Sequence, residues 1–218
     1  LFLSPRIFAE SFYNQKDIFF LAITIINMFT GIIFINNPNF KNTIAFSFSS
    51  ALLIDTRIMA LIPIFIIFAI FFLKSLRDKE FLIKNLKFII LFIPTTLFFI
   101  FLFWPYIWSD PINNFLFGFS ELLSVESNTT SLYLGEFILS KNAPWHYQIV
   151  WIAVTSPVII ILLFFVGLLI LTRRLLSRLI VVDKKSNEIW RGNNEIIDIY
   201  FLLMTLIPIF LFINKGIG

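Results

Sequence analysis

Long apolar runs constrain this sequence more than any other feature. A bilayer core about 30 Å thick requires a helix of roughly 17–25 predominantly apolar residues, and four runs meet or approach that length. None of them alternates with a period of two, as a barrel strand would, so we expect each to be a helix. The four runs are Ile18–Ile35, Phe88–Trp104, Ile149–Leu171 and Ile196–Ile213.

The composition indicates lipid rather than water as the main solvent. Hydrophobic residues make up 59% of the chain and charged residues only 14%, against about 45–50% and about 25% in soluble domains. Cysteine is absent, which excludes disulfides, thiolate metal sites and a cysteine nucleophile. The net charge of +4 comes from residues in short loops between apolar runs, where membrane orientation explains them. We therefore expect no nucleic-acid partner.

The segment Thr43–Leu73 permits two interpretations. A single helix would be about 46 Å long, which exceeds a simple span. Two helices, Thr43–Ile54 and Ile58–Leu73, would both be short, and charged residues at Asp55 and Arg57 would separate them. Because charges at the membrane centre are costly, we favour two helices, which brings the predicted total to about six transmembrane helices in an all-α polytopic membrane protein.

Lysine and arginine predict the orientation. They gather in two connections, which contain Lys74, Arg77, Lys79, Lys84 and Lys87, and Arg173, Arg174, Arg178, Lys184, Lys185 and Arg191. Two spans separate these connections, so they share a face, which the positive-inside rule makes cytoplasmic. Residues 172–195 are then a cytoplasmic basic loop. Residues 105–146, with one lysine and no arginine, form a loop on the outer (periplasmic or luminal) side.

If residues 43–73 form two helices, the N-terminal segment also lies on the outer side. In that case Arg6 to Asp17 lie on the face that carries Asp55 and Arg57, whereas a single helix would place them inside. Apolar residues at helical spacing within the outer loop predict an amphipathic helix that lies in the interface, and residues 3–12 show a similar pattern. The loop residues in question are Phe115, Leu116, Phe119, Leu122 and Leu123.

The chain reads as one transmembrane domain over residues 1–218. It begins at Leu1 without methionine and ends at Gly218 directly after an apolar run, so we expect it to be truncated at both ends. A multi-pass position in a bacterial inner membrane, with the active face outward, is the expected location.

No nucleotide-binding, metalloprotease or serine-hydrolase motif occurs in the sequence. The candidate functional residues are therefore cations, acids and aromatic residues. Arg6 and Lys16 could hold a phosphate while Asp17 orients a polar group. The same residues could be snorkelling cations and an acid that complements a helix dipole. No cluster of cysteine and histidine predicts a metal site.

Asp55 and Arg57 form the second candidate group. Ionisable residues within membrane segments indicate function, and the forked guanidinium of arginine suits phosphate. In the functional interpretation, Arg57 faces an anionic head group and Asp55 orients it. In the alternative, the two side chains neutralise each other at a turn.

Aromatic residues frame the outer loop. They could stack on a sugar or lipid, or form an ordinary interfacial belt. His146, the only histidine, could cap a helix or donate to a phosphate. The acids Asp110, Glu121, Glu126 and Glu136 show no spacing that indicates a catalytic pair. The four candidate stacking residues are Tyr106, Trp108, Trp145 and Tyr147.

Three segments resemble glycosyltransferase family 39 of the GT-C superfamily, which contains the protein-mannosyltransferase-like and aminoarabinose-transferase-like proteins. The first is Pro5-Arg6-Ile7-Phe8 through Tyr13-Asn14-Gln15-Lys16-Asp17 before a span, and the second is the short span ending near Asp55-Thr56-Arg57-Ile58. The third is Trp104-Pro105-Tyr106-Ile107-Trp108 leading to Pro144-Trp145-His146-Tyr147. Each motif is short and moderately specific.

The resemblance implies a GT-C-like fold and a polyprenyl- or dolichyl-phosphate-linked sugar donor. It also implies transfer on the outer face, with a carboxylate base and inversion at the anomeric carbon. That base would precede Leu1, so no catalytic residue is assigned here. Arg57, Lys16, Arg6 and His146 are then expected to bind the donor phosphate. A divalent metal occurs in some family members, with acids that this sequence does not show.

Two other functions stay open. A transporter or flippase for a lipid-linked saccharide would bind the same head group without reacting, although no internal repeat of the kind found in transporters is evident. A non-catalytic membrane scaffold is the third possibility. The sugar and the acceptor cannot be read from the sequence.

Overall fold

The computed structural model describes residues 5–77, 79–123, 130–139, 142–180 and 193–215. These residues are predominantly helical, which agrees with the all-α prediction, and they also contain one antiparallel hairpin that was not predicted. Two compact units make up the chain, one of residues 11–125 and one of residues 1–10 and 126–218. The first helix, α1 (Pro5–Tyr13), continues from one into the other.

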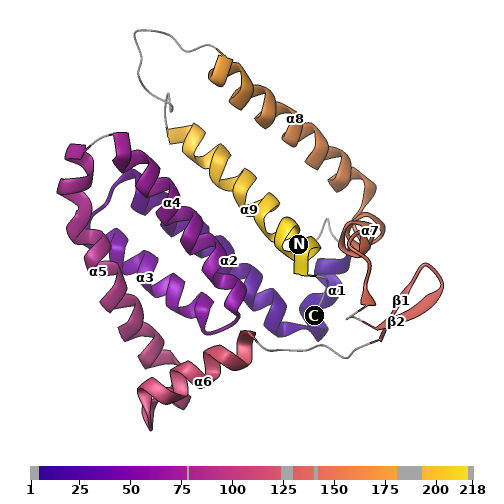
Figure 1. Cartoon of the computed structure of the whole chain (residues 1–218), viewed down its shortest axis with the longest axis horizontal. Helices are drawn as coiled ribbons and strands as arrows, with labels where there is room; N and C mark the ends of the chain where they lie inside the picture. The colour runs from indigo at the N-terminus through magenta and orange to yellow at the C-terminus, as the bar shows by residue number, and fades with distance from the viewer. Residues whose placement is uncertain (1–4, 78, 124–129, 140–141, 181–192, 216–218) are drawn as a thin grey trace. The chain divides into compact units, whose positions relative to one another are not determined.

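The unit of residues 11–125 consists of four long helices followed by a 3-10 turn and a shorter helix (Figure 1). Residues 43–73 contribute two of the long helices, as favoured from the sequence. The elements are α2 (Gln15–Asn36), α3 (Phe40–Ile54), the 3-10 turn η1 (Ile58–Ala60), α4 (Leu61–Arg77), α5 (Lys79–Phe103), the 3-10 turn η2 (Pro105–Trp108) and α6 (Pro111–Leu123).

Side-chain hydrogen bonds show that α2 and α3 are antiparallel. The Asn27 amide nitrogen donates to the hydroxyls of Ser49 at 3.1 Å and Ser50 at 2.9 Å, while Arg57 after α3 meets Asp17 at the start of α2. Figure 1 shows α4 beside α2 and α5 beside α3, and both pairs are in contact. One end of the unit therefore gathers the start of α2, the turn after α3 and the end of α5.

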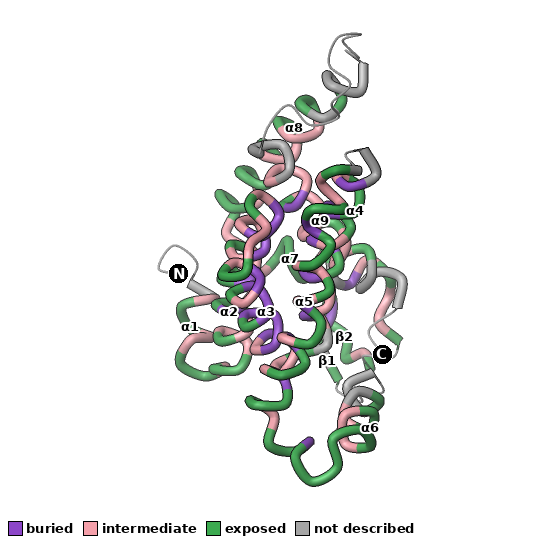
Figure 2. The backbone as a smooth tube through the Cα atoms, turned by 90° about the vertical axis from the view of Figure 1, so that its left-hand side faces the viewer, coloured by how far each residue is buried: buried purple, intermediate pink, exposed green. Residues whose placement is uncertain are grey.

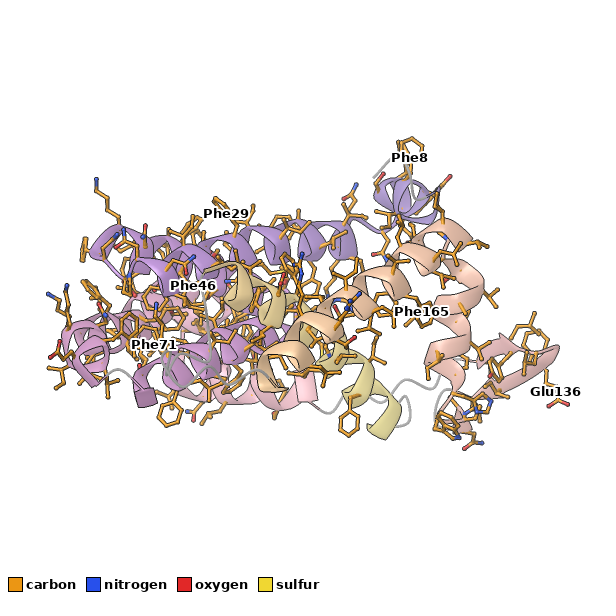
Figure 3. All side chains as sticks on the ribbon, turned by 90° about the horizontal axis from the view of Figure 1, so that it is seen from above. Phe8, Phe29, Phe46, Phe71, Glu136 and Phe165 are labelled. Atoms are coloured by element: carbon orange, nitrogen blue, oxygen red, sulfur yellow. The ribbon has the colours of Figure 1, made fainter. Side chains whose placement is uncertain are left out.

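Aromatic packing forms the core of this unit. The Phe46 ring of α3 lies 5.5 Å from that of Phe34 and 5.0 Å from that of Phe92, and Phe71 stacks on Phe34 at 5.9 Å. Such pairs contribute about 0.5–1.5 kcal/mol beyond burial. Phe46 and Phe71 lie among the helices in Figure 3, whereas Phe29 points away from them. The buried positions in Figure 2 accordingly include one side of α2 and a larger part of α3.

Small polar side chains let α3 approach its neighbours closely. The hydroxyls of Ser47 and Thr95 are 2.8 Å apart between α3 and α5, and Gly31 of α2 faces α3 and α4. Short side chains and hydroxyl hydrogen bonds are the usual means of joining helices where apolar burial alone gives no preference.

Two of the described helices are long and apolar enough to cross a membrane, and they span Gln15–Asn36 and Glu80–Phe103. They contain the predicted spans Ile18–Ile35 and most of Phe88–Trp104. Shorter apolar helices occur at Phe40–Ile54, Leu61–Ser75 and Ile197–Phe210. The total of six spans stays a prediction.

The other unit contains the hairpin and three helices. Strands β1 (Thr130–Tyr133) and β2 (Glu136–Leu139) pair through a two-residue turn, and the helices are α7 (Tyr147–Thr155), α8 (Val158–Ile180) and α9 (Asn193–Lys215). The turn residues Leu134 and Gly135 have φ of 51° and 94°. Glycine adopts this region freely, but in leucine it costs about 1–2 kcal/mol.

The prediction of one continuous span at Ile149–Leu171 is wrong. Ser156 adopts an extended conformation with ψ of 139° because Pro157 follows it and disfavours helical geometry. The helix therefore breaks between α7 and α8, and Figure 1 shows α7 along its axis while α8 is seen from the side.

The predicted basic loop 172–195 is also partly helical. α8 continues to Ile180 and α9 begins at Asn193, while residues 181–192 lie outside the described part of the chain. Arg174 donates from Nη1 to the Asp198 carboxylate at 3.3 Å, which links α8 to α9. The predicted span Ile196–Ile213 lies within α9. The two predicted amphipathic helices are present as α1 and α6.

We predict that Gly31→Ala destabilises the α2–α4 contact. A Cβ atom at Gly31 would lie 2.8 Å from Cδ1 of Ile67 and 3.1 Å from the Phe46 ring, and overpacking of this kind costs about 1–3 kcal/mol. Adding Ile67→Val, which removes Cδ1, should recover part of the loss. Unfolding in detergent followed by circular dichroism measures both effects.

Gly167→Ala is the matched control, because nothing lies within 4 Å of a Cβ atom at that helical glycine. It should retain or slightly increase stability, as alanine favours the helix over glycine by roughly 0.5–1 kcal/mol. Equal losses in the two variants would contradict the packing that we describe.

Candidate functional site

Arg57 and Asp17 meet at one end of the unit formed by residues 11–125. Arg57 donates from Nη2 to the Asp17 carboxylate across forty residues of sequence. Its guanidinium also lies over the Phe20 ring, with Cζ 5.9 Å from the centroid. Both partners of the ion pair are more than 40% exposed, at 44% and 43%, so the pair adds at most about 1 kcal/mol to stability.

Asn14 positions Asp17 from the other side. The Asn14 side chain caps α2 by accepting from the Asp17 backbone nitrogen at 3.4 Å, and its amide nitrogen donates to the Asp17 carboxylate at 2.5 Å. The first of these bonds is that of a helix N-cap, and the second joins the Asn14 side chain to the carboxylate that meets Arg57. Asp17 also lies in the first turn of α2, where a negative charge complements the helix dipole.

Lys16 precedes Asp17 on the first turn of α2, and its side chain is exposed. Two cations, Lys16 from α2 and Arg57 from the turn between α3 and η1, are therefore present at the same end of the unit. We call the residues Asn14, Lys16, Asp17, Phe20 and Arg57 the Arg57 cluster. Its cations and exposed edge suit a small anionic group, since arginine offers several N–H donors in one plane.

Asp55 does not orient Arg57, contrary to the sequence-based hypothesis. Asp17 is the carboxylate that contacts the guanidinium. Among the described residues, neither carboxylate oxygen of Asp55 has a hydrogen-bond partner, and both are enclosed. Burial raises the pKa of Asp55 to about 7 from 3.8, because desolvation disfavours the charged form. Asp55 follows the last residue of α3 and lies outside both candidate spans.

Aromatic residues of η2 lie at the same end as the Arg57 cluster. Tyr106 and Trp108 are exposed, and the indole nitrogen of Trp108 donates to the Phe101 carbonyl at 2.6 Å. Trp104 packs against Phe115 of α6 at 6.2 Å. A Cβ atom at Gly118 would come within 2.9 Å of Trp104, so this indole fixes α6. Tyr106 and Trp108 retain exposed rings that could stack on a ligand.

The candidates near α7 belong to the other unit. His146 precedes α7 and makes no side-chain capping bond, and Trp145 beside it is 66% exposed. Tyr147 is buried against Tyr133 and Trp151, with ring distances of 5.1 Å and 6.2 Å. Its predicted role in stacking on a ligand is therefore wrong, because its ring packs within the protein.

The four predicted phosphate-binding residues divide between the two units. Lys16 and Arg57 belong to residues 11–125, whereas Arg6 and His146 belong to the other unit. Arg6 lies in α1, and its side chain is outside the described part of the structure. A joint role for all four stays a prediction.

The acids offer no metal site within the described residues, where no group of three or more histidine, aspartate or glutamate side chains could hold an ion. Asp110 caps α6 by accepting from the Asn113 backbone at 3.3 Å and from the Asn113 side chain at 2.7 Å. Glu136 is exposed on β2. The side chains of Glu121 and Glu126 lie outside the described part of the chain.

Comparison with known proteins gives no relative: no family model, curated protein or solved structure matches the chain.

Two members of the Arg57 cluster, and one contact of His146 in the other unit, were missed from the sequence. Asn14 could have been found from its spacing to Asp17, which is that of a capping box. Phe20 lies one helical turn beyond Asp17, but no local pattern indicates that Arg57 covers its ring. The contact of Tyr133 with His146, at 5.9 Å between ring centroids, depends on the hairpin and had no signal.

We predict that Asp55 makes the stability of the protein fall as pH rises. Its folded-state pKa is about 7, above the value in the unfolded chain, so the folded state binds more protons between these values and loses stability as they dissociate. Thermal unfolding at pH 5 and at pH 8 should show that the stability of Asp55→Asn relative to the wild type is greater at the higher pH.

The exposed carboxylate of Asp110 serves as the control, and Asp110→Asn should not reproduce this gain at pH 8. If wild type and Asp55→Asn differ equally at both pH values, Asp55 is not an enclosed titrating group.

Proposed function

We propose that the chain is part of a membrane glycosyltransferase that takes a sugar from a polyprenyl-phosphate donor on the non-cytoplasmic face. The observation that carries this proposal is the Arg57 cluster, in which an exposed guanidinium from the turn after α3 and an exposed lysine from α2 share one end of a helical unit. Fixed cations at such a position stabilise a phosphate leaving group. The first two of the three segments that resemble glycosyltransferase family 39 contain residues of this cluster.

A membrane location is supported by the surface of the helices. Only 22% of the most apolar part of α2 and 17% of that of α5 are buried within the protein, whereas the core helix of a soluble protein would be mostly buried. Apolar side chains such as Ile25 and Phe29 of α2 and Ile90 of α5 are exposed instead. Lipid would cover these surfaces, and the helices satisfy their own backbone hydrogen bonds.

The orientation is supported by the distribution of charge in residues 11–125. The Arg57 cluster lies at the end where α2 begins, whereas Lys74 contacts the Ile35 carbonyl at the other end of α2, at 3.4 Å. Lys79, Lys84 and Lys87 lie in the first turns of α5, which begins at that second end. The positive-inside rule makes the lysine-rich end cytoplasmic, so the Arg57 cluster faces outward.

We predict that Arg57→Ala weakens the binding of polyprenyl phosphate. Affinity for a polyprenyl phosphate should fall by roughly tenfold or more, because a hydrogen bond to a charged group contributes about 1.5–3 kcal/mol. Binding to the purified protein in proteoliposomes measures it, with the uncharged polyprenol as the comparison ligand. The substitution should lower the affinity for polyprenyl phosphate and leave the weaker affinity for polyprenol unchanged.

Arg173→Ala is the matched control, because Arg173 is an exposed arginine near the basic end of α8. It should bind polyprenyl phosphate as the wild type does. Equal affinity of the wild type for polyprenyl phosphate and polyprenol would reject the phosphate site, and so would equal losses in the two arginine variants.

A separate measurement distinguishes transfer from transport. Proteoliposomes that contain the full-length protein and a polyprenyl-phosphate sugar, labelled in both the lipid and the sugar, are analysed for free polyprenyl phosphate and for movement of the intact lipid between leaflets. A transferase releases polyprenyl phosphate when an acceptor is present. Movement of the intact lipid without release would replace the proposed enzyme with a flippase.

A further inference from the structure

The hairpin presents an exposed apolar face. Its register places Leu132 opposite Phe137 and Thr130 opposite Leu139, and side chains alternate between the two faces of a strand, so these four share one face. Phe137 is 79% exposed and Leu132 is 57% exposed. No charged residue occupies this face, and Glu136, labelled in Figure 3, belongs to the opposite one.

The tip of the hairpin adds another exposed apolar side chain. Leu134 is 78% exposed and occupies the first turn position with a positive φ. Asparagine, aspartate or glycine normally fills this position in a two-residue hairpin, since they tolerate the left-handed conformation. Leucine has neither a conformational nor a solubility advantage there in water. Its presence indicates that the tip contacts an apolar medium.

Tyr133 attaches the hairpin to the start of α7. Its ring is buried on the face opposite Phe137, 5.1 Å from Tyr147 and 5.9 Å from His146. The contact fixes which face of the hairpin is covered by protein and leaves the Phe137 face outward. The attachment point is at the end of the unit where α8 begins, away from Arg173 and Arg174 near the other end of that helix.

We propose that the face formed by Leu132, Leu134, Phe137 and Leu139 inserts into the bilayer surface on the non-cytoplasmic side. The proposal rests on the membrane location and orientation of the proposed function. Apolar side chains are also exposed on α7 and α8 of the same unit, among them Val154, Val158 and Leu162. Trp145, also exposed between the hairpin and α7, is a residue that favours the interface.

Lipid explains this face better than a protein partner does. An isolated two-stranded hairpin is at best marginally stable in water and needs an apolar surface to pack against. The face is small and without charge, so it offers no polar rim of the kind that orients a protein partner. The interfacial zone of a bilayer accepts such a face without specific contacts, as it does for amphipathic helices.

Site-directed fluorescence tests this contact, because the chain contains no cysteine and single cysteines can be labelled selectively. Phe137→Cys and Glu136→Cys, adjacent residues on opposite faces, are each labelled with the environment-sensitive dye NBD and reconstituted into vesicles that contain acyl-chain nitroxide lipid. Quenching should be at least about twofold stronger at position 137 than at position 136. The label at Leu134→Cys should be quenched as strongly as the label at Phe137→Cys. This second position controls for a local effect of the label at position 137.

Ile25→Cys, on the exposed apolar surface of α2, reports on membrane insertion independently. Strong quenching at position 25 with equal or no quenching at positions 136 and 137 overturns the hairpin proposal and leaves the membrane location intact. Absence of quenching at position 25 overturns the membrane location itself. Strong quenching at positions 25, 134 and 137, with little at position 136, is the expected result.

Discussion

The hydrogen bonds between Asn27 and the two serines of α3 set the register on which the candidate site depends. With these contacts in place, α2 and α3 are antiparallel and the turn after α3 reaches the start of α2. A shift of one helical turn, about 5.4 Å, would move Arg57 away from Asp17. The cations at this end of the unit are therefore positioned by a buried amide roughly half a helix away, and the exposed ion pair only completes the arrangement.

Much of the helical fold could be predicted because apolar length is a local property of the sequence. The runs within α2, α5 and α9 are helical throughout, although Pro94 lies inside α5 and Pro208 inside α9, and the charged turn at Asp55 and Arg57 correctly divided the next segment. The failure at Ile149–Leu171 has a specific cause. Pro157 and the extended Ser156 before it end α7, although the run as a whole is strongly apolar. Hydropathy alone does not detect that break.

The candidate site could be predicted in its residue types but only partly in its contacts. Arg57 and Asp17 were both selected, yet the sequence paired Arg57 with its neighbour Asp55, because proximity along the chain was the only distance known. Helix packing supplied the actual partner. Tyr147 was assigned to a ligand since it lies in an aromatic run, but the hairpin buries its ring, and a leucine–glycine turn gives a weak signal for a hairpin. Long-range packing decided each of these cases.

The position of Phe20 restricts how any ligand can approach Arg57. With the ring against one face of the guanidinium and Asp17 at Nη2, an incoming anion has access mainly along the remaining edge of the plane. Edge-on contact favours two parallel hydrogen bonds to adjacent oxygen atoms. A lysine ammonium is a point charge without a plane, so it would preserve the attraction at this position and lose the directional selection between a tetrahedral oxyanion and a simple halide.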